Sequence, residues 1–286
     1  MSDPTTAVRL PRADTSLGRR LREPARQGAI VLAYFAQFLK MRLAYRVDFT
    51  VDLAANLFAI GVQLATLAVL FSKVPELKGW SFEQVLFIYG FSLLPLGLFN
   101  LISINIYRFA EHYIADGNLD RVLLRPVNPL AQVLFESFNV SGLNELLLGT
   151  GIMVVAGSRL GLEPGLLDVL VVLVLVPSAA LVYVAVFLGL TAVSFWHEDR
   201  MGLAPPVYNV IRFARYPLTI YGRWVQAFLT FVLPFAWVAY MPATWFVGGP
   251  EIRRWALLTP LVALLVLAVA YAIWRAGLSR YASTGS

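Results

Sequence analysis

The chain has 286 residues, of which 59% are hydrophobic and only 14% are charged, and its mean hydropathy is +0.70. Soluble domains carry roughly 25% charged residues, so this composition excludes an ordinary soluble protein and indicates a membrane protein. The net charge of +6 does not favour a nucleic acid partner, because nine of the 23 basic residues precede Val47 and most others stand near the ends of apolar runs, as at a membrane surface.

The first part of the chain precedes the apolar runs. Residues 1–28 mix Arg, Pro, Asp and Ser without apolar periodicity, which predicts a flexible cytoplasmic tail, and they lack the pattern of a signal peptide. In residues 29–47, Val31, Phe35 and Phe38 recur at helical spacing, which predicts an amphipathic helix lying in the membrane interface. The alternative is that this segment forms part of the first transmembrane helix.

Six apolar segments follow, and the sequence predicts an all-α membrane protein with six transmembrane helices. A helix of about 20 residues crosses a bilayer core of about 30 Å, because each residue adds about 1.5 Å. The fourth segment is longer than this and must tilt, kink or project, with Pro177 as the point of weakness. The predicted spans are residues 53–71, 85–107, 140–158, 166–196, 217–240 and 255–274, and residues 281–286 form a C-terminal tail.

The distribution of basic residues predicts the orientation. Six spans place both termini on one side, and if that side is cytoplasmic it holds 18 basic residues against 5 on the other. This excess agrees with the positive-inside rule. We therefore expect a multi-pass protein of the bacterial cytoplasmic (inner) membrane with both termini in the cytoplasm.

Motifs for covalent chemistry are missing from the sequence. There is no P-loop, no H-E-x-x-H, no G-x-S-x-G and no cysteine, so we expect no catalytic residue, cofactor or metal in this chain. His197, Glu198 and Asp199 most simply form a solvated helix end. A membrane-embedded enzyme that uses these three residues remains the alternative.

Glu145 is the one ionisable residue placed firmly inside a predicted span. A charge in hydrocarbon is costly and usually faces a partner or a cavity, so Glu145 either pairs with an arginine, lines a polar route or lies close enough to the interface to reach water. An ion-coupled secondary transporter is a further alternative. It would need matching internal repeats, and the two groups of three spans show none that is convincing.

Several phrases of the chain resemble a known family. They are GNLDRVLLRPVNP at 117–129, YPL at 216–218, LPFA at 233–236 and YMPA at 240–243. Together with the flat N-terminal helix, the six spans and a helical loop after the second span, they resemble the ABC-2 type permeases over about residues 29–280. These permeases are the membrane subunits of bacterial ATP-binding-cassette exporters.

The resemblance implies that the loop at 108–125, which would carry the coupling helix, docks on a nucleotide-binding subunit. Physically, Phe109 and Tyr113 are suited to anchor a short helix, and Gly117 to stop it. The alternative is an interfacial helix that touches only lipid. The predicted docking residues are Arg108, Glu111, His112, Tyr113, Asp116, Gly117, Asp120 and Arg121.

The resemblance also implies a re-entrant hairpin between the fifth and sixth spans, which helps to close the external end of the path. Prolines and glycines allow residues 235–246 to fold back, and one long kinked helix is the alternative. The predicted gate residues are Pro234, Phe235, Pro242, Gly248 and Gly249.

The function expected from the resemblance is that of a non-catalytic permease subunit of an ABC exporter. An identical or sister permease would complete the translocation path as a dimer, and separate ATPase subunits would hold ATP and Mg. The lipid bilayer is the remaining expected partner.

Overall fold

The computed structural model describes residues 46–139, 141–196 and 203–281, and within these ranges the regular structure is helical, apart from an isolated bridge between Leu77 and Trp80. The predicted helical class is therefore confirmed. The tail at 1–28, nearly all of the interfacial helix at 29–47, His197 with its two acidic neighbours, and the C-terminal tail beyond residue 281 lie outside the described residues.

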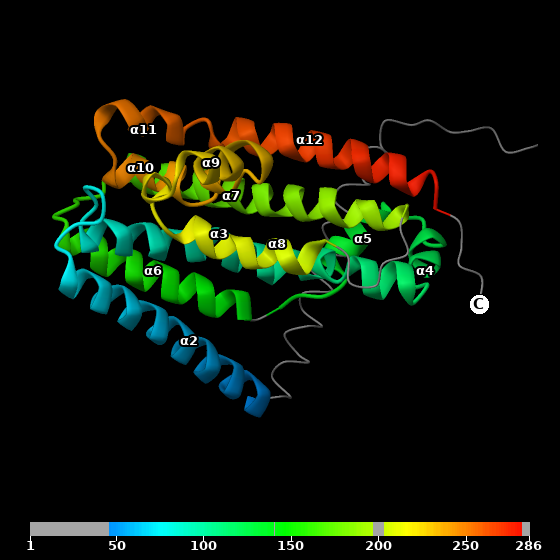
Figure 1. The fold of residues 1–286 in the computed structure, drawn as a ribbon. Coiled ribbons are helices and arrows are strands. Elements are labelled where there is room, and N and C mark those ends of the chain that lie inside the picture. The colour runs from blue at the N-terminus through cyan, green and yellow to red at the C-terminus, as the bar shows by residue number, and fades with distance from the viewer. Residues whose placement is uncertain (1–45, 140, 197–202, 282–286) are drawn as a thin grey trace, which may run out of the picture.

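Five long helices form an elongated bundle (Figure 1). Short helices connect them and gather at the two ends of the bundle and along one side. The label η denotes a 3-10 or π-helix. The long helices are α2 (Arg46–Lys73), α3 (Phe82–Tyr107), α6 (Ser141–Arg159), α7 (Leu166–Ala192) and α12 (Thr259–Leu278). The short ones are η1 (Ala110–Ala115), α4 (Leu119–Leu123), α5 (Pro129–Phe135), η2 (Val193–Phe195), α8 (Ala204–Val210), η3 (Ile211–Arg215), η4 (Leu218–Ile220), α9 (Arg223–Ala227), η5 (Phe228–Val232), η6 (Phe235–Trp237), α10 (Tyr240–Val247) and α11 (Pro250–Ala256).

Helix α3 is the centre of the bundle. Of its most apolar 18-residue window 83% is buried, against 11% for α2, so α3 forms the core and α2 lies at the edge. A capping box begins α3: the Ser81 hydroxyl accepts from the Gln84 backbone N–H at 3.3 Å, and the Gln84 side chain accepts from the Ser81 N–H at 3.0 Å. This pairing satisfies two of the N–H groups that a helix start leaves open.

Glycines bring α3 and α6 into backbone contact. A Cβ atom added to Gly90 would lie 2.7 Å from the Met153 nitrogen, and one added to Gly149 would lie 2.8 Å from the Gly90 carbonyl oxygen. Only residues without a Cβ fit at such distances. Small residues at helix contacts are common in membranes, where close packing rather than water exclusion holds helices together.

Within the described ranges, four helices are long and apolar enough to cross a membrane, or five if the bent segment between residues 223 and 247 is one span. Helix α6 has 19 residues but is not among them, since Asn144, Glu145 and its glycines lower its apolar character. Six spans thus remain a prediction. The four helices are Leu53–Lys73, Phe82–Ala115, Leu166–Phe195 and Glu251–Leu278.

The predicted fifth span at 217–240 is not one continuous helix. The helical turns break first at Tyr221 and Gly222, and again at Leu233 and Pro234, where Leu233 takes an extended conformation. Pro234 has no backbone N–H to continue a helix. The two halves of the segment, before and after this second break, differ in direction by 78°.

Residues 203–219 run along α3 toward its start. Near the end of α3, the ring of Tyr208 lies 5.2 Å from that of Tyr107, and the Tyr208 hydroxyl donates to the Asn100 side-chain oxygen at 3.3 Å. At the other end, the Trp80 indole N–H donates to the Thr219 hydroxyl at 2.7 Å, just before α3 begins.

This course revises the assignment of two basic residues to the cytoplasmic side. Arg215 donates to the Gln63 side-chain oxygen at 2.6 Å, so it lies within the bundle, and Arg223 follows η4 at the Trp80 end. The predicted excess of cytoplasmic charge does not depend on them, because nine basic residues precede Val47.

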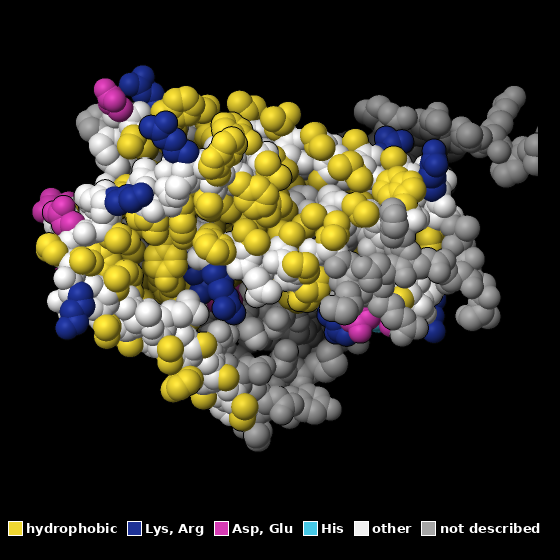
Figure 2. Space-filling view, viewed as in Figure 1, with side chains coloured by type: hydrophobic (Ala, Val, Ile, Leu, Met, Phe, Trp, Pro, Cys, Tyr) yellow, Lys and Arg dark blue, Asp and Glu magenta, His cyan; other side chains and the backbone are white. Residues whose placement is uncertain are grey.

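Hydrophobic and charged side chains are largely separated on the surface. In Figure 2, hydrophobic side chains cover much of the visible face, while acidic and most basic side chains gather toward the two ends of the view. Basic side chains are also visible in the hollow between α2 and the rest of the bundle. An apolar band between charged ends is the pattern expected of a membrane-embedded bundle.

Candidate functional site

The predicted docking residues come together in one loop, which we call the η1–α4 loop and define as residues 108–125. It follows directly on α3, turns through η1 and α4, and packs beside α5 at one end of the bundle. The turn between η1 and α4 needs Gly117, whose φ of +70° is a left-handed conformation that other residues rarely adopt. The predicted helix stop at Gly117 is confirmed.

Aromatic rings anchor this loop to the C-terminal ends of the long helices. Phe109 is fully buried and stacks on Tyr113, with centroids 5.4 Å apart. The other contacts of Phe109 are edge-on, to Trp274 of α12 at 4.9 Å and to Phe195 of η2 at 5.5 Å. Edge-to-face pairs at these distances add about 0.5–1.5 kcal/mol each beyond burial. The loop is therefore tied to α12 and to η2, which follows α7.

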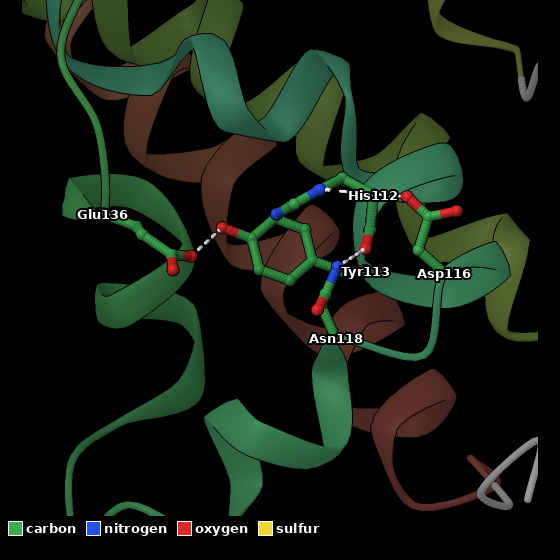
Figure 3. Close-up of polar contacts among 5 residues, drawn as sticks. All are labelled: His112, Tyr113, Asp116, Asn118 and Glu136. Carbon is green, nitrogen blue, oxygen red and sulfur yellow. Dashed lines mark hydrogen bonds and ion pairs between the residues drawn. The ribbon is translucent and has the colours of Figure 1, made fainter. Parts of the chain in front are cut away.

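Polar contacts then fix the loop internally, as Figure 3 shows. The Tyr113 hydroxyl donates to the Glu136 carboxylate, which follows α5. The Asn118 amide donates to the His112 carbonyl at 2.9 Å, and the His112 imidazole lies 4.0 Å from the Asp116 carboxylate. The anchor and these bonds together hold the loop in one shape.

The C-terminus of the described chain also braces the loop. The Tyr281 hydroxyl, which follows α12, donates to the Asp120 carboxylate at 3.1 Å. Burial, followed by this hydrogen bond, raises the pKa of Tyr281 above its ordinary value. The hydroxyl therefore stays protonated and able to donate at neutral pH.

The outer face of the loop remains open for contact. Tyr113 is only 2% exposed and holds the loop from inside, so it does not offer a surface to another protein in this conformation. Two leucines stand out on the loop, because Leu123 is 41% and Leu124 is 86% exposed. Beside the loop, a small hollow of ≈ 180 Å³ lies between Arg108 and Glu136. The exposed predicted residues are Arg108, Glu111, Asp116 and Arg121, and His112, Gly117 and Asp120 are partly exposed.

The predicted gate residues lie in the bent segment at the opposite end. Phe235 is fully buried, with its ring 5.5 Å from that of Tyr183 in α7. Beyond it, α10 returns toward the start of α3, where the rings of Phe246 and Phe87 are 5.5 Å apart. Both ends of the segment thus lie near the start of α3. Pro242 is buried within α10, and Gly248 and Gly249 form the turn into α11 with extended backbone.

Glu145 lies inside the bundle but makes no ion pair with an arginine among the described residues. Its carboxylate accepts from the Asn100 amide at 2.8 Å, and Asn100 in turn accepts from Tyr208. Nearby, the Gln63 side-chain oxygen accepts from both Tyr89 and Arg215. These hydrogen bonds form two networks, which join α2, α3, α6 and the 203–219 segment.

Sequence reasoning did not identify several partners of these sites. No motif links Glu136, which follows α5, to the loop, and none links Arg215 to Gln63. Asp168 accepts from Trp245 at 2.8 Å across 77 positions, a contact that no local pattern indicates. The exposure of Leu124 has a faint signal, since a leucine pair inside a short polar loop is unusual.

No group of three or more His, Asp and Glu side chains within the described ranges is placed to hold a metal ion. Comparison with curated proteins finds no match, and comparison with solved structures finds none. A family model described as "ABC-2 family transporter protein" matches residues 57–285, which is most of the chain. Permeases of this family associate with ABC ATPase subunits. Given this match and the apolar helices of the bundle, the chain belongs to the ABC-2 transporter family and is a multi-pass membrane permease.

Proposed function

We propose that this permease is the membrane subunit of an ABC exporter in a bacterial inner membrane, with both termini in the cytoplasm. Separate ATPase subunits bind ATP and Mg and dock on the η1–α4 loop. The observation that carries this proposal is the build of the loop: its aromatic side is locked to η2 and α12, whereas its outer side presents charged residues and Leu124. A rigid loop of this kind can transmit a push to the bundle.

A second permease, identical or sister, would complete the translocation path. Helix α2 supports this part of the proposal, because only 11% of its apolar window is buried within the chain. Several of its side chains are exposed, among them Val51 at 61% and Phe58 at 75%. A partner permease or lipid must cover these apolar side chains. The centre of a protein–protein interface is typically apolar, so this face of α2 is suited to contact a second permease.

We further propose six membrane crossings, with the fifth made by residues 203–219 and a re-entrant hairpin made by residues 223–247. The support is that Thr219 and Phe246 both lie near the start of α3, so the intervening chain enters and leaves at one end. Broken backbone at membrane depth is tolerated where protein surrounds it, and Phe235 is fully buried. In the exporter, this hairpin would close the external end of the path.

The test is co-purification of the tagged protein from its native host in mild detergent. Asp116→Arg reverses an exposed charge on the loop, and Glu76→Arg makes the same change at the opposite end of the bundle. We expect an ATPase subunit with the wild type and with Glu76→Arg, but not with Asp116→Arg. Recovery of a second permease would identify the pairing.

The competing function is an ion-coupled secondary transporter. If no ATPase subunit accompanies folded wild-type protein, and transport follows a proton gradient without ATP, the exporter proposal is wrong. Equal ATPase recovery with Asp116→Arg would keep the exporter but remove the η1–α4 loop as its docking site.

A further inference from the structure

A cavity of ≈ 560 Å³ opens at the end of the bundle opposite the η1–α4 loop. It lies between the C-terminal half of α6, the first turns of α7, and the α10 and α11 helices. Small-molecule sites have volumes of about 300–1,000 Å³ and mostly apolar walls, and this cavity meets both conditions. Its apolar wall includes Phe87, Met153, Gly157, Val172 and Phe246.

Charged side chains stand together on one part of the cavity lining. Asp168 accepts from the Trp245 indole N–H at 2.8 Å and from the Gly165 N–H at 3.0 Å. The Arg253 guanidinium lies 3.7 Å from Asp168 and 4.2 Å from the centre of the Trp245 ring. Both oxygens of Asp168 are therefore engaged, whereas Arg253, whose side chain is 47% exposed, has further N–H donors to offer.

Glu163 supplies a second carboxylate to the same lining. It is exposed at the turn between α6 and α7, and no hydrogen bond or ion pair holds it among the described contacts. The lining thus carries one cation with spare donors and one anion with spare acceptors.

The cavity opens on an apolar outer surface. Val154 of α6 and Val169 of α7 both line it, and they are 60% and 49% exposed. A surface of this kind in a membrane bundle meets acyl chains, and charged residues beside it mark the depth of the lipid headgroups. An amphiphile with an acyl chain and a charged head fits both parts.

We propose that this cavity binds one phospholipid with a primary-amine headgroup, of the phosphatidylethanolamine class. An acyl chain fills the apolar part, the phosphate meets Arg253, and the ammonium donates to Glu163. Charge complementarity selects this headgroup, because a zwitterion matches the separate cation and anion of the lining. The site links α10 and α11 to α6 and α7, so a bound lipid braces the segment that follows the bend. The inference does not depend on the ATPase partner.

The test is native mass spectrometry of the full chain in detergent, titrated with palmitoyl-oleoyl phosphatidylethanolamine, phosphatidylcholine or phosphatidylglycerol. We expect the wild type to retain phosphatidylethanolamine about fivefold better than the other two, which is the size of one favourable exposed charge contact. Glu163→Gln should remove the preference over phosphatidylcholine, whose methylated amine cannot donate. Glu251→Gln, an exposed change outside the cavity, should keep it.

Two further pairs of variants test the contact between Arg253 and the phosphate, and the cavity itself. Arg253→Gln should weaken all three lipids, and Arg254→Gln, which is outside the cavity, should not. At Gly157 an added Cβ would meet the Phe87 ring at an ordinary 3.5 Å, so Gly157→Ala fits, whereas Gly157→Leu fills the cavity. Thermal unfolding checks that each variant is folded. Equal retention of the three lipids by wild type, or binding unaffected by Gly157→Leu, would overturn the proposal.

Discussion

Gly97 of α3 and Gly142 of α6 meet backbone to backbone. A Cβ atom added to Gly97 would lie 2.6 Å from the Gly142 carbonyl oxygen, and one added to Gly142 would collide with the Gly97 carbonyl oxygen. Together with the Gly90 and Gly149 contact, this pair sets how closely the central helix approaches its neighbour. Alanine at either position must push the helices apart.

We therefore predict that Gly97→Ala destabilises the folded protein by about 1–3 kcal/mol, the usual cost of overpacking. Thermal unfolding in detergent, followed by tryptophan fluorescence, measures the change. Gly151→Ala is the matched control on α6, because nothing lies within 4 Å of a Cβ there. A Gly97→Ala protein as stable as Gly151→Ala would contradict the close contact.

Leu124 gives a second prediction, which concerns docking. If the ATPase subunit covers this leucine, which is 86% exposed, Leu124→Asp should weaken their association about tenfold or more, because a buried apolar contact is replaced by a charge. Leu124→Met keeps an apolar side chain and should bind normally. Titration of the purified permease with its ATPase subunit measures both. Normal binding by Leu124→Asp would exclude Leu124 from the interface.

The Tyr113 hydroxyl allows packing and hydrogen bonding to be separated. Tyr113→Phe keeps the ring stack with Phe109 but removes the bond to Glu136, and we expect a local loss of about 1 kcal/mol, since the exposed carboxylate regains water. Hydrogen exchange in residues 110–115 should become about fivefold faster. Tyr113→Ala, which also removes the buried ring, should accelerate exchange much further. Unchanged exchange in Tyr113→Phe would show that the hydrogen bond does not stabilise η1.

A fourth prediction concerns Gln63, because its side-chain oxygen accepts from both Tyr89 and Arg215. Gln63→Leu leaves both donors without their partner and should destabilise the fold by about 1–3 kcal/mol. Gln63→Glu keeps an acceptor and adds a charge opposite to that of Arg215, so it should be clearly more stable than Gln63→Leu. Thermal unfolding of the two variants compares them. Equal stability would mean that α2 does not depend on this polar contact.

Much of the helical framework was predictable because its signals are local. Ser81 and Gln84 form the capping box three residues apart, so α3 starts only three residues before its predicted boundary. Gly117 adopts the left-handed conformation that stops η1. Helix α7 ends at Ala192 and η2 continues to Phe195, close to the predicted end of the fourth span. Each signal acts between residues that are within one or two helical turns of each other. Such residues are close in space because they are close in the sequence.

The course of residues 203–219 shows what local signals leave out. Hydropathy favours the more apolar residues 217–240 as a crossing, whereas the residues just before them carry Arg212 and Arg215. In the bundle, Arg215 bonds to Gln63, a partner 152 positions away that offsets part of the cost of its charge. Without that partner in view, the sequence could not place this segment along α3.

By itself the sequence determined that this protein is a helical membrane protein, because the length and apolarity of its runs decide their transfer into a bilayer whatever the arrangement of the helices. The tertiary structure alone decided which residues meet: the Gly97 and Gly142 backbones, Trp245 and Asp168, and Tyr113 and Glu136. These contacts join residues far apart in the chain. They depend on how whole helices pack, and neither hydropathy nor propensity carries that information.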